Sequence, residues 1–291
     1  MKIKNIAFIG LGNMGFYMAR HLLKNKYKIF PHDINKNNLK NFYNETKIKE
    51  ENFIESLEKI DCVILMVPSS KEVNDIIFKN TKLSQKLKKN SVIIDMSTSI
   101  PTETLKIGKK LKQKKIKFYD CPVAGGVKFA KTGELTLFFG GTKKNDEILR
   151  VLKCFGKIIW CGKLGSGHSL KALNNFINAS ILNTYLEAIA TAIKFGIKKN
   201  FLINAIDQAT TGKNHPYFKK IKDGILMKNY NSGFTLNLLT KDVHIANNLI
   251  KKYVKNATVS SNILKLLKKS KKKLGKNSDQ LKLYKMWSNT I

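Results

Sequence analysis

Lys171, Asn174 and Asn175 are the residues whose types and spacing could carry out proton transfer. They lie near the start of a long apolar segment with helical periodicity, and side chains at i, i+3 and i+4 share one face of a helix. Polar groups on a largely buried helix need partners, so a cleft between domains is their expected location. Burial would lower the pKa of the lysine toward the range that suits an acid/base near neutral pH. The alternative is that Lys171 is one more surface lysine in a chain rich in them.

A glycine-rich segment near the N-terminus could bind phosphate. An apolar, strand-like run leads directly into Gly10-Leu11-Gly12-Asn13-Met14-Gly15, which leads into a helical pattern. In this order Gly10 permits a tight turn, Gly12 lets backbone N–H groups approach a pyrophosphate, and Gly15 lets the helix lie close to the strand. A glycine turn made for purely geometric reasons is the alternative. The strand before, the helix after and an acid further on favour dinucleotide binding.

Asp33 is that acid. It follows a second apolar run and lies 23 residues after Gly10. A carboxylate at this place accepts hydrogen bonds from ribose hydroxyls and repels a 2′-phosphate. The sequence therefore predicts NAD, with NADP less favoured.

Two further segments with candidate binding residues follow strand-like runs. The segment from Asp120 to Gly126 ends in Gly125 and Gly126, whose backbone N–H groups could hold a carboxylate, although a plain turn is the alternative. Ser97 and Thr98 end another run. Their hydroxyls could contact nicotinamide or substrate, or could cap the helix that begins after them.

The elements that would position these residues fall into two groups. Up to about residue 162, apolar runs alternate with helical patterns, which predicts a parallel, doubly wound α/β sheet of the Rossmann type. The expected strands lie near 3–9, 27–32, 61–67, 91–96, 116–120 and 135–140, and the expected helices near 13–24, 71–79 and 101–114.

After residue 162 the pattern is helical. One stretch from 166 to 195, about 45 Å long at 1.5 Å per residue, is long enough to join two domains. Helical patterns follow near 200–209, 241–253, 259–273 and 279–287, with Ser278 or Asp279 as N-cap of the last, and no convincing strand is present. We therefore expect an NAD-binding domain over 1–163 and an all-helical domain over 164–291, joined by the long interdomain helix.

The composition indicates a strongly basic protein. Among 291 residues, 54 Lys and Arg against 20 Asp and Glu give a formal net charge of +34, which could attract nucleic acid or an anionic membrane. Only Arg20 and Arg150 are arginines, however, and no interleaving of aromatic and basic residues for base stacking is present. No run approaches the ~18 uncharged apolar residues of a membrane span. Neither partner is therefore expected.

The expected location and redox state follow from the N-terminus and the cysteines. The first strand begins by Ile3 and leaves no room for a targeting peptide, so a cytoplasmic location is expected. The cysteines show no C-x-x-C pairing and are expected to be reduced and structural. The histidines form no metal-binding cluster, so no metal site is expected. The cysteines are Cys62, Cys121, Cys154 and Cys161, and the histidines are His21, His32, His168, His215 and His244.

Four blocks of this chain resemble, in order, those of the β-hydroxyacid dehydrogenases, which include 3-hydroxyisobutyrate dehydrogenase and related semialdehyde reductases. The blocks are Gly10 to Gly15, Asp120 to Gly126, Gly165-Ser166-Gly167 with Lys171-Ala172-Leu173-Asn174-Asn175, and Lys241-Asp242. The resemblance covers essentially the full chain. It implies an NAD-dependent oxidoreductase that interconverts a small 3-hydroxy acid and its semialdehyde in a cleft between two domains.

The resemblance also implies roles for individual residues. Lys171 would be the catalytic acid/base, Asn175 would orient the substrate beside it, and Gly125 and Gly126 would hold the substrate carboxylate through their backbone. Apart from the resemblance, Asn174 on the same helix face as Lys171 and Ser97 at a strand end are also expected to bind substrate, from their positions. The glycine loop (Gly10, Leu11, Gly12, Asn13, Met14 and Gly15), Asp33, Val67, Pro68, Thr98 and Lys241 would contact the cofactor.

Two departures from the family pattern concern the substrate. Ala124 stands where the family usually has serine, and the segment 210–215, with Lys213, Asn214 and His215, does not match the 3-hydroxyisobutyrate enzymes. An NADP-linked reductase of glyoxylate, succinic or tartronate semialdehyde is therefore the runner-up. A non-catalytic dinucleotide- or nucleic-acid-binding protein on the same scaffold is the alternative of another class. The long apolar helix and the helical tail favour a homodimer or homotetramer.

Overall fold

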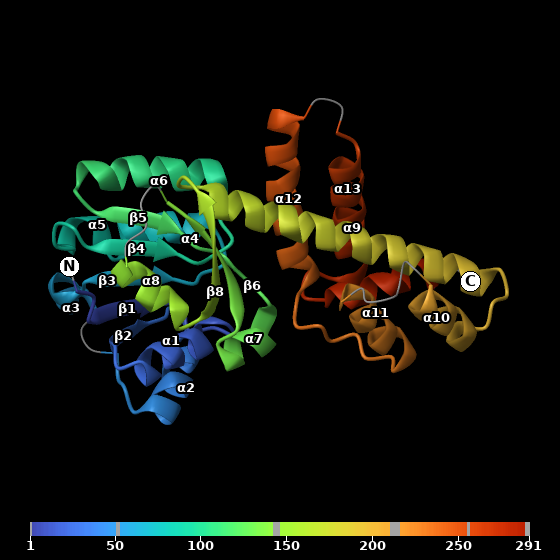
Figure 1. Cartoon of the computed structure of the whole chain (residues 1–291), viewed down its shortest axis with the longest axis horizontal. Helices are drawn as coiled ribbons and strands as arrows, with labels where there is room; N and C mark the ends of the chain where they lie inside the picture. The colour runs from blue at the N-terminus through green and yellow to red at the C-terminus, as the bar shows by residue number, and fades with distance from the viewer. Residues whose placement is uncertain (1, 51–52, 142–145, 210–215, 255–256, 289–291) are drawn as a thin grey trace. The chain divides into compact units, whose positions relative to one another are not determined.

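The computed structural model describes residues 2–50, 53–141, 146–209, 216–254 and 257–288. It divides into two compact units, Met1–Lys171 and Ala172–Ile291 (Figure 1). The first contains a β-sheet with helices packed on it, and the second is helical. The fold class expected from the sequence is confirmed.

The first unit is built on an eight-stranded sheet. Hydrogen bonding joins its strands in the order β2-β1-β3-β4-β5-β7-β6, with β8 paired to β7. The five strands from β2 to β5 in this order run parallel, so their C-terminal ends meet at one edge. The strands are β1 (Asn5–Ile9), β2 (Lys28–His32), β3 (Cys62–Leu65), β4 (Val92–Asp95), β5 (Lys117–Asp120), β6 (Val123–Ala124), β7 (Leu135–Gly140) and β8 (Gly156–Gly162).

The far edge of the sheet differs from the parallel arrangement predicted from the sequence. Strand β7 runs antiparallel to β5 and to β6, and β8, which was not predicted, runs parallel to β7. Helix α7 (Gly126–Thr132) lies between β6 and β7. Its seven residues rise only about 10 Å, less than the ~20 Å of a six-residue strand, so it cannot return the chain for a parallel pairing. The sheet is therefore mixed.

Helices cover both faces of this sheet, as Figure 1 shows. Successive residues of β1 enter different cores: Ile6 and Phe8 pack with α1, α2 and α8, whereas Ala7 and Ile9 pack with α3 to α6. This alternation follows from the two-residue period of a strand. The helices are α1 (Gly15–Lys24), α2 (Lys36–Thr46), α3 (Phe53–Ser56), η1 (Leu57–Lys59), α4 (Ser70–Asp75), η2 (Ile76–Asn80), α5 (Leu83–Lys86), α6 (Pro101–Gln113) and α8 (Asp146–Lys153).

The second unit contains helices around a large apolar core, with a smaller apolar cluster of Ala172, Ile245 and Ala246, and no strand is assigned in its described residues. Leu182, Leu186 and Ile189 of α9 pack there with Leu239 and Val243 of α12. The helices are α9 (Ser166–Lys194), which begins in the first unit, α10 (Lys199–Gln208), α11 (Pro216–Leu226), α12 (Leu236–Tyr253), α13 (Val259–Leu274), η3 (Gln280–Tyr284) and α14 (Lys285–Ser288). The long helix predicted over 166–195 is thereby confirmed.

Helix α9 is also the one helix of the described chain that is long and apolar enough, by length and composition alone, to cross a membrane. Within its most apolar window 33% of the residues are buried in the protein. A core helix of a globular protein passes the same test, so this is a weak indication. Packing in the core of the second unit accounts for Ala179, Leu182, Leu186 and Ile189 of α9, whereas Ile177 is 53% exposed.

Several shorter helices were not predicted, and α2 shows why. Only Phe42 of its eleven residues is buried, and its apolar residues, Leu39, Phe42 and Tyr43, span little more than one helical turn, which is a short signal for a helix. The helix begins where the Asn35 side chain accepts a hydrogen bond from the N–H of Asn37. At the other end of the chain, the Asp279 carboxylate caps η3 by accepting from the Leu281 N–H, as predicted.

Candidate active site

The glycine loop joins β1 to α1, and its three glycines meet three different steric demands. Gly10 has a φ of +97°, and a Cβ there would lie 2.2 Å from the carbonyl oxygen of Met66. A Cβ on Gly15 would lie 1.9 Å from the Gly10 carbonyl oxygen, so this glycine lets α1 approach the loop. A Cβ on Gly12 would meet no atom within 4 Å. The fold therefore requires Gly10 and Gly15, and Gly12 leaves open space at the backbone.

The start of α1 fits an anion. Its N-cap residue, Met14, makes no side-chain hydrogen bond to the first turn, and that turn has no acidic side chain. Uncapped N–H groups at a helix N-terminus, together with the helix dipole, favour a phosphate group. Leu11 is buried in the core beneath the loop, whereas Gly12 and Asn13 are exposed. The loop is thus suited to a dinucleotide pyrophosphate.

The Asp33 carboxylate lies directly beside this loop. It is 8% exposed and accepts hydrogen bonds from the N–H of Leu11 at 2.7 Å, the N–H of Asn35 at 2.8 Å and the side-chain amide of Asn38 at 3.0 Å. These bonds tie the end of β2 to the glycine loop. A carboxylate has about four lone-pair sites, so one remains for a ribose hydroxyl.

The loops after β3 and β4 meet at the same edge of the sheet. The hydroxyl of Ser97 accepts a hydrogen bond from the Val67 N–H at 3.0 Å, and the Ser97 N–H donates to the Asp95 carboxylate at 2.9 Å. Ser97 is buried, whereas Val67, Pro68 and Thr98 are half-buried or exposed. Ser97 therefore joins the two loops, and it does not cap α6, whose N-cap is Ile100.

Gly125 and Gly126 lie at the start of α7. Both have positive φ, +124° and +74°, and both are exposed. A Cβ on Gly125 would lie 2.9 Å from the Cβ of Phe129, whereas one on Gly126 would meet no atom within 4 Å. No side-chain hydrogen bond caps this turn, which follows the half-buried Ala124.

The start of α9 is fixed by Asp120. Its carboxylate is fully buried and accepts hydrogen bonds from the N–H of Gly165 at 2.7 Å and of His168 at 2.8 Å. Glycines make room for this arrangement: a Cβ on Gly140 would lie 2.2 Å from an Asp120 carboxylate oxygen, and one on Gly167 would lie 2.1 Å from the Phe138 carbonyl oxygen. The Gly165-Ser166-Gly167 block is therefore needed for close packing of α9 on the sheet.

Lys171 follows one turn later on α9 and is half-buried as the last residue of the first unit. In the second unit, Asn175 is 7% exposed and donates its side-chain amide to the Asp242 carboxylate at 2.6 Å. The ammonium of Lys241 lies 3.2 Å from the other Asp242 oxygen. Asn174 is half-buried. The hydrogen bond from its side-chain amide to the Asp242 carboxylate fixes the orientation of Asn175.

The cysteines are not suited to nucleophilic chemistry. All four are free of disulfides. Burial, and after it the nearby Asp120 carboxylate, raises the pKa of Cys121 well above its usual value and that of Cys161 to about 11. In the part of the chain that the structure describes, no three His, Cys, Asp or Glu side chains gather in a group that could hold a metal ion.

Sequence reasoning assigned no contact to His168, Asp95, Asp120 or Asp242. Each is buried. Asp95 ends the apolar strand β4, and Asp120 ends β5 directly after the buried Phe118 and Tyr119. An acidic residue at the end of a buried strand is the signal that could have pointed to them, since a buried carboxylate needs donors. Lys213, Asn214 and His215, the expected specificity segment, lie outside the described residues.

Two family models match the chain. The first is the NAD binding domain of 6-phosphogluconate dehydrogenase, which matches residues 5–162. The second is described as the NAD-binding of NADP-dependent 3-hydroxyisobutyrate dehydrogenase and matches residues 165–287.

Several proteins that are similar to this chain in sequence or fold are named 3-hydroxyisobutyrate dehydrogenase. The mitochondrial 3-hydroxyisobutyrate dehydrogenase of Rattus norvegicus is 30% identical over 83% of this chain and 74% of its own length, and that of Drosophila melanogaster is 32% identical over 84% and 76%. A solved structure of Mycobacterium tuberculosis 3-hydroxyisobutyrate dehydrogenase with L-serine has a TM-score of 0.85 and 24% identity, and the match covers 98% of this chain and 99% of that one.

A glycine loop on a doubly wound sheet, followed by a helical unit that matches a dehydrogenase domain, defines an NAD-binding oxidoreductase. The chain belongs to the β-hydroxyacid dehydrogenase family, as its motifs suggested, and is a hydroxyacid dehydrogenase.

Proposed function

We propose that this hydroxyacid dehydrogenase interconverts a small 3-hydroxy acid similar to 3-hydroxyisobutyrate and its semialdehyde, with NAD as cofactor and Lys171 as acid/base. The observation that carries the proposal is the placement of a half-buried lysine one turn after the helix start that Asp120 anchors to the sheet. The names of the relatives support the substrate class.

The chemistry divides between the cofactor and the protein. NAD supplies the hydride acceptor when it is bound. In oxidation the neutral amine of Lys171 accepts the proton of the substrate hydroxyl, and in reduction its ammonium returns that proton to the carbonyl oxygen. Gly125 and Gly126 offer backbone donors for the substrate carboxylate, and the oriented amide of Asn175 contributes to substrate binding.

Replacing Lys171 with alanine tests this role. The variant should bind NAD with nearly the wild-type Kd and lose at least about 10²-fold in kcat, because general acid–base catalysis contributes roughly 10²- to 10⁴-fold. Lys163→Ala is the matched control, since Lys163 is exposed just before the same helix. A wild-type kcat in Lys171→Ala would refute the assignment.

The preference for NAD rests on Asp33. Its buried carboxylate, held against the glycine loop, supports repulsion of a 2′-phosphate. In Asp33→Ala the kcat/KM value with NAD should therefore lie closer to the kcat/KM value with NADP than it does in the wild type. The control is Asp223→Ala, which removes an exposed acidic side chain of the second unit. An unchanged ratio in Asp33→Ala would remove the basis for the preference.

The substrate is to be identified with a panel of small hydroxy acids and semialdehydes, including glyoxylate, succinic semialdehyde and tartronate semialdehyde, each tested with NAD and with NADP. We expect the highest kcat/KM with a 3-hydroxy acid and NAD. Ala124→Ser should lower KM for the acid, because it adds a hydroxyl donor beside the Gly125 backbone. A preference for a semialdehyde with NADP would favour the runner-up.

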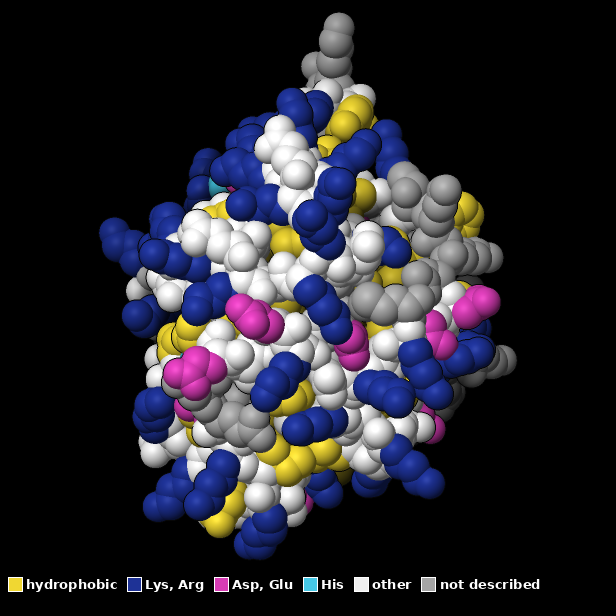
Figure 2. All heavy atoms as spheres, turned by 90° about the vertical axis from the view of Figure 1, so that its left-hand side faces the viewer, with side chains coloured by type: hydrophobic (Ala, Val, Ile, Leu, Met, Phe, Trp, Pro, Cys, Tyr) yellow, Lys and Arg dark blue, Asp and Glu magenta, His cyan; other side chains and the backbone are white. Residues whose placement is uncertain are grey.

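The distribution of charge supports a small acid as ligand. Figure 2 shows Lys and Arg side chains scattered over the visible face among acidic, polar and apolar ones, without a continuous stripe. Such a field raises the capture rate of small anions. Binding of duplex DNA with a steep salt dependence, together with no turnover of any hydroxy acid, would favour the nucleic-acid alternative instead.

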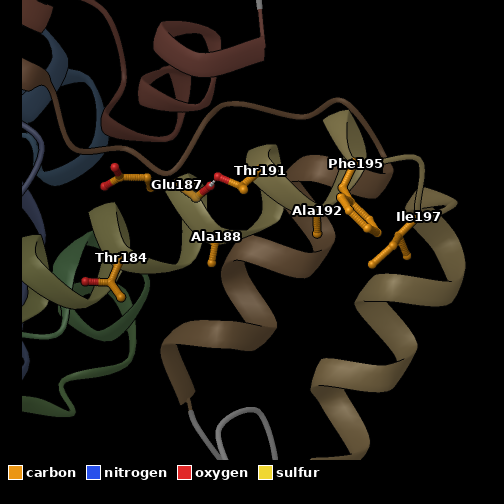
Figure 3. Close-up of a pocket in the computed structure, with 7 residues that line it drawn as sticks. All are labelled: Thr184, Glu187, Ala188, Thr191, Ala192, Phe195 and Ile197. Atoms are coloured by element: carbon orange, nitrogen blue, oxygen red, sulfur yellow. Dashed lines mark hydrogen bonds between the residues drawn. The ribbon is translucent and has the colours of Figure 1, made fainter.

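We further propose that the protein is a homodimer or homotetramer. Support comes from the second unit, where the side chains of Phe195 and Phe201 are 86% and 69% exposed. A shallow hollow of about 580 Å³ lies on α9, with Phe195 and Ile197 together at one end (Figure 3). Phe195→Glu should shift the mass measured by light scattering toward the monomer, whereas an unchanged mass would place the contact elsewhere.

A further inference from the structure

A fully buried histidine lies in the first turn of α9, between two buried aspartates. His168 is 0% exposed, and Asp95 and Asp120 are 1% and 0% exposed. Nε2 of the ring lies 3.6 Å from a carboxylate oxygen of Asp95, and Nδ1 lies 3.8 Å from one of Asp120. The three side chains come from the end of β4, the end of β5 and the start of α9.

The two carboxylates otherwise have only neutral donors. Asp95 accepts hydrogen bonds from the Ser97 N–H and the Ser99 hydroxyl, and Asp120 accepts from two main-chain N–H groups at the start of α9. In the described residues, the ion pairs of Asp95 and Asp120 both involve His168, at 3.6 Å and 3.8 Å. Two buried negative charges without a cation are costly, so a positive charge is needed here.

The surroundings of the ring suit a proton on each nitrogen. The Thr104 hydroxyl lies 3.1 Å from the Ile100 carbonyl oxygen, to which it donates, so its lone pairs face Nδ1 at 2.8 Å. In this arrangement Nδ1 is protonated and donates to the hydroxyl. Nε2 has no hydrogen-bond partner among the described residues and faces the Asp95 carboxylate. A proton on Nε2 would point at a negative charge, whereas a bare lone pair there would be repelled.

We propose that His168 is an imidazolium that neutralises Asp95 and Asp120, and that it is thereby a positioning residue for Lys171. The ring connects the first turn of α9 to α6 through Thr104 and faces β4 through Asp95. Lys171 lies three residues further on the same helix, so the position and rotation of this turn set the position of its ammonium group. This second part rests on the proposed function of Lys171.

The charge of the ring can be measured directly in the wild-type full chain. Protein labelled with ¹⁵N-histidine is recorded at pH 7, and His168→Gln assigns the signal by its disappearance. The two ring nitrogens should resonate close together, as they do when both carry protons. A wide separation, with one nitrogen unprotonated, would overturn the proposal. This measurement tests the charge of His168 and does not depend on the role of Lys171. The role of Lys171 is tested separately by the kcat of Lys171→Ala.

Charge compensation tests the positioning role. In His168→Gln we expect kcat to fall about 10- to 100-fold with KM for NAD within about twofold, because small displacements of a catalytic group are costly whereas the glycine loop is untouched. Adding Asp95→Asn should restore kcat to within about fivefold of wild type. The asparagine oxygen can still accept from the Ser97 N–H, and its amide can donate to the Ser99 hydroxyl.

The control is His21→Gln. His21 is also in the first unit, but its Nε2 contacts the backbone carbonyls of Ala130 and Lys131, and a glutamine amide can replace that donor. This variant should keep wild-type kcat. If His168→Gln keeps wild-type kcat, or if the double variant is no more active than the single one, the ring charge does not position the catalytic lysine and the proposal fails.

Discussion

Replacing Gly12 with alanine should weaken cofactor binding without weakening the fold, and replacing Gly15 should do the reverse. The two residues lie three positions apart in the same loop. A Cβ on Gly12 meets nothing within 4 Å, whereas one on Gly15 would lie 1.9 Å from the Gly10 carbonyl oxygen. The comparison therefore separates a glycine that keeps space for a ligand from one that keeps space for the protein.

The magnitudes follow from these distances. In Gly12→Ala the free energy of unfolding should change by no more than about 0.5 kcal/mol, as for other substitutions that meet no neighbour. If the methyl group displaces the pyrophosphate from one charge-assisted hydrogen bond of about 1.5 to 3 kcal/mol, the Kd for NAD rises roughly 10- to 150-fold. In Gly15→Ala the overlap should cost about 1 to 3 kcal/mol or more, because a backbone carbonyl has to move.

Isothermal titration with NAD and urea unfolding measure the two effects independently. Gly233→Ala is a further comparison, since Gly233 lies in the second unit with φ of +76° and no atom near its Cβ, so it should lose stability slightly and bind NAD normally. An unchanged Kd in Gly12→Ala would mean that the pyrophosphate does not approach this backbone. The assignment of the loop would then be wrong.

Three further outcomes are expected. Gly167→Ala, whose Cβ would lie 2.1 Å from the Phe138 carbonyl oxygen, should displace α9 and lower kcat about 10²-fold with little change in the Kd for NAD; wild-type kinetics would contradict this. Burial would raise the pKa of Asp61, but hydrogen bonds from two main-chain N–H groups and Lys88 outweigh it and hold the pKa below 3.8. Its contribution to stability is therefore present above that pH and lost as the pH falls through the folded value, so urea midpoints of Asp61→Asn should fall less on acidification below about pH 4 than those of wild type. With its pKa raised to about 11, Cys161 is roughly 10⁻³ ionised at pH 8 and should react slowly with iodoacetamide in peptide mapping, and rapid labelling would disagree.

The glycine loop could be predicted because its requirements are local. The strand, the turn and the helix follow one another within a few residues, and Gly15 faces the Gly10 carbonyl oxygen inside that stretch. The Met66 carbonyl that crowds Gly10 comes directly after β3, and this part of the requirement could not be predicted. The long helix was predictable for a similar reason, since its apolar residues repeat with helical spacing. Lys171 stood out by its place on that helix, although its role came from a family resemblance and remains a proposal.

The surroundings of His168 could not be predicted in the same way. Its partners lie 48 and 73 residues earlier in the chain, at the ends of two strands that only the folded sheet brings together. The sequence shows one histidine and two aspartates, and residue types carry no information on which of them meet. The direction of β7 was missed for a related reason, because it depends on pairing with the two-residue strand β6.

The packing of Asp120 against Gly140 means that the residue allowed at one of these positions depends on the residue at the other. The pair face each other across the β5–β7 ladder, and the atoms nearest a Cβ on Gly140 all belong to the Asp120 carboxylate. Any larger residue at position 140 is therefore tolerated only after position 120 has become smaller, and a smaller residue at 120 gives up the carboxylate on which the helix start rests. A substitution at either position alone is therefore expected to destabilise the protein. The effects of substitutions at the two positions should depend strongly on each other, which is epistasis.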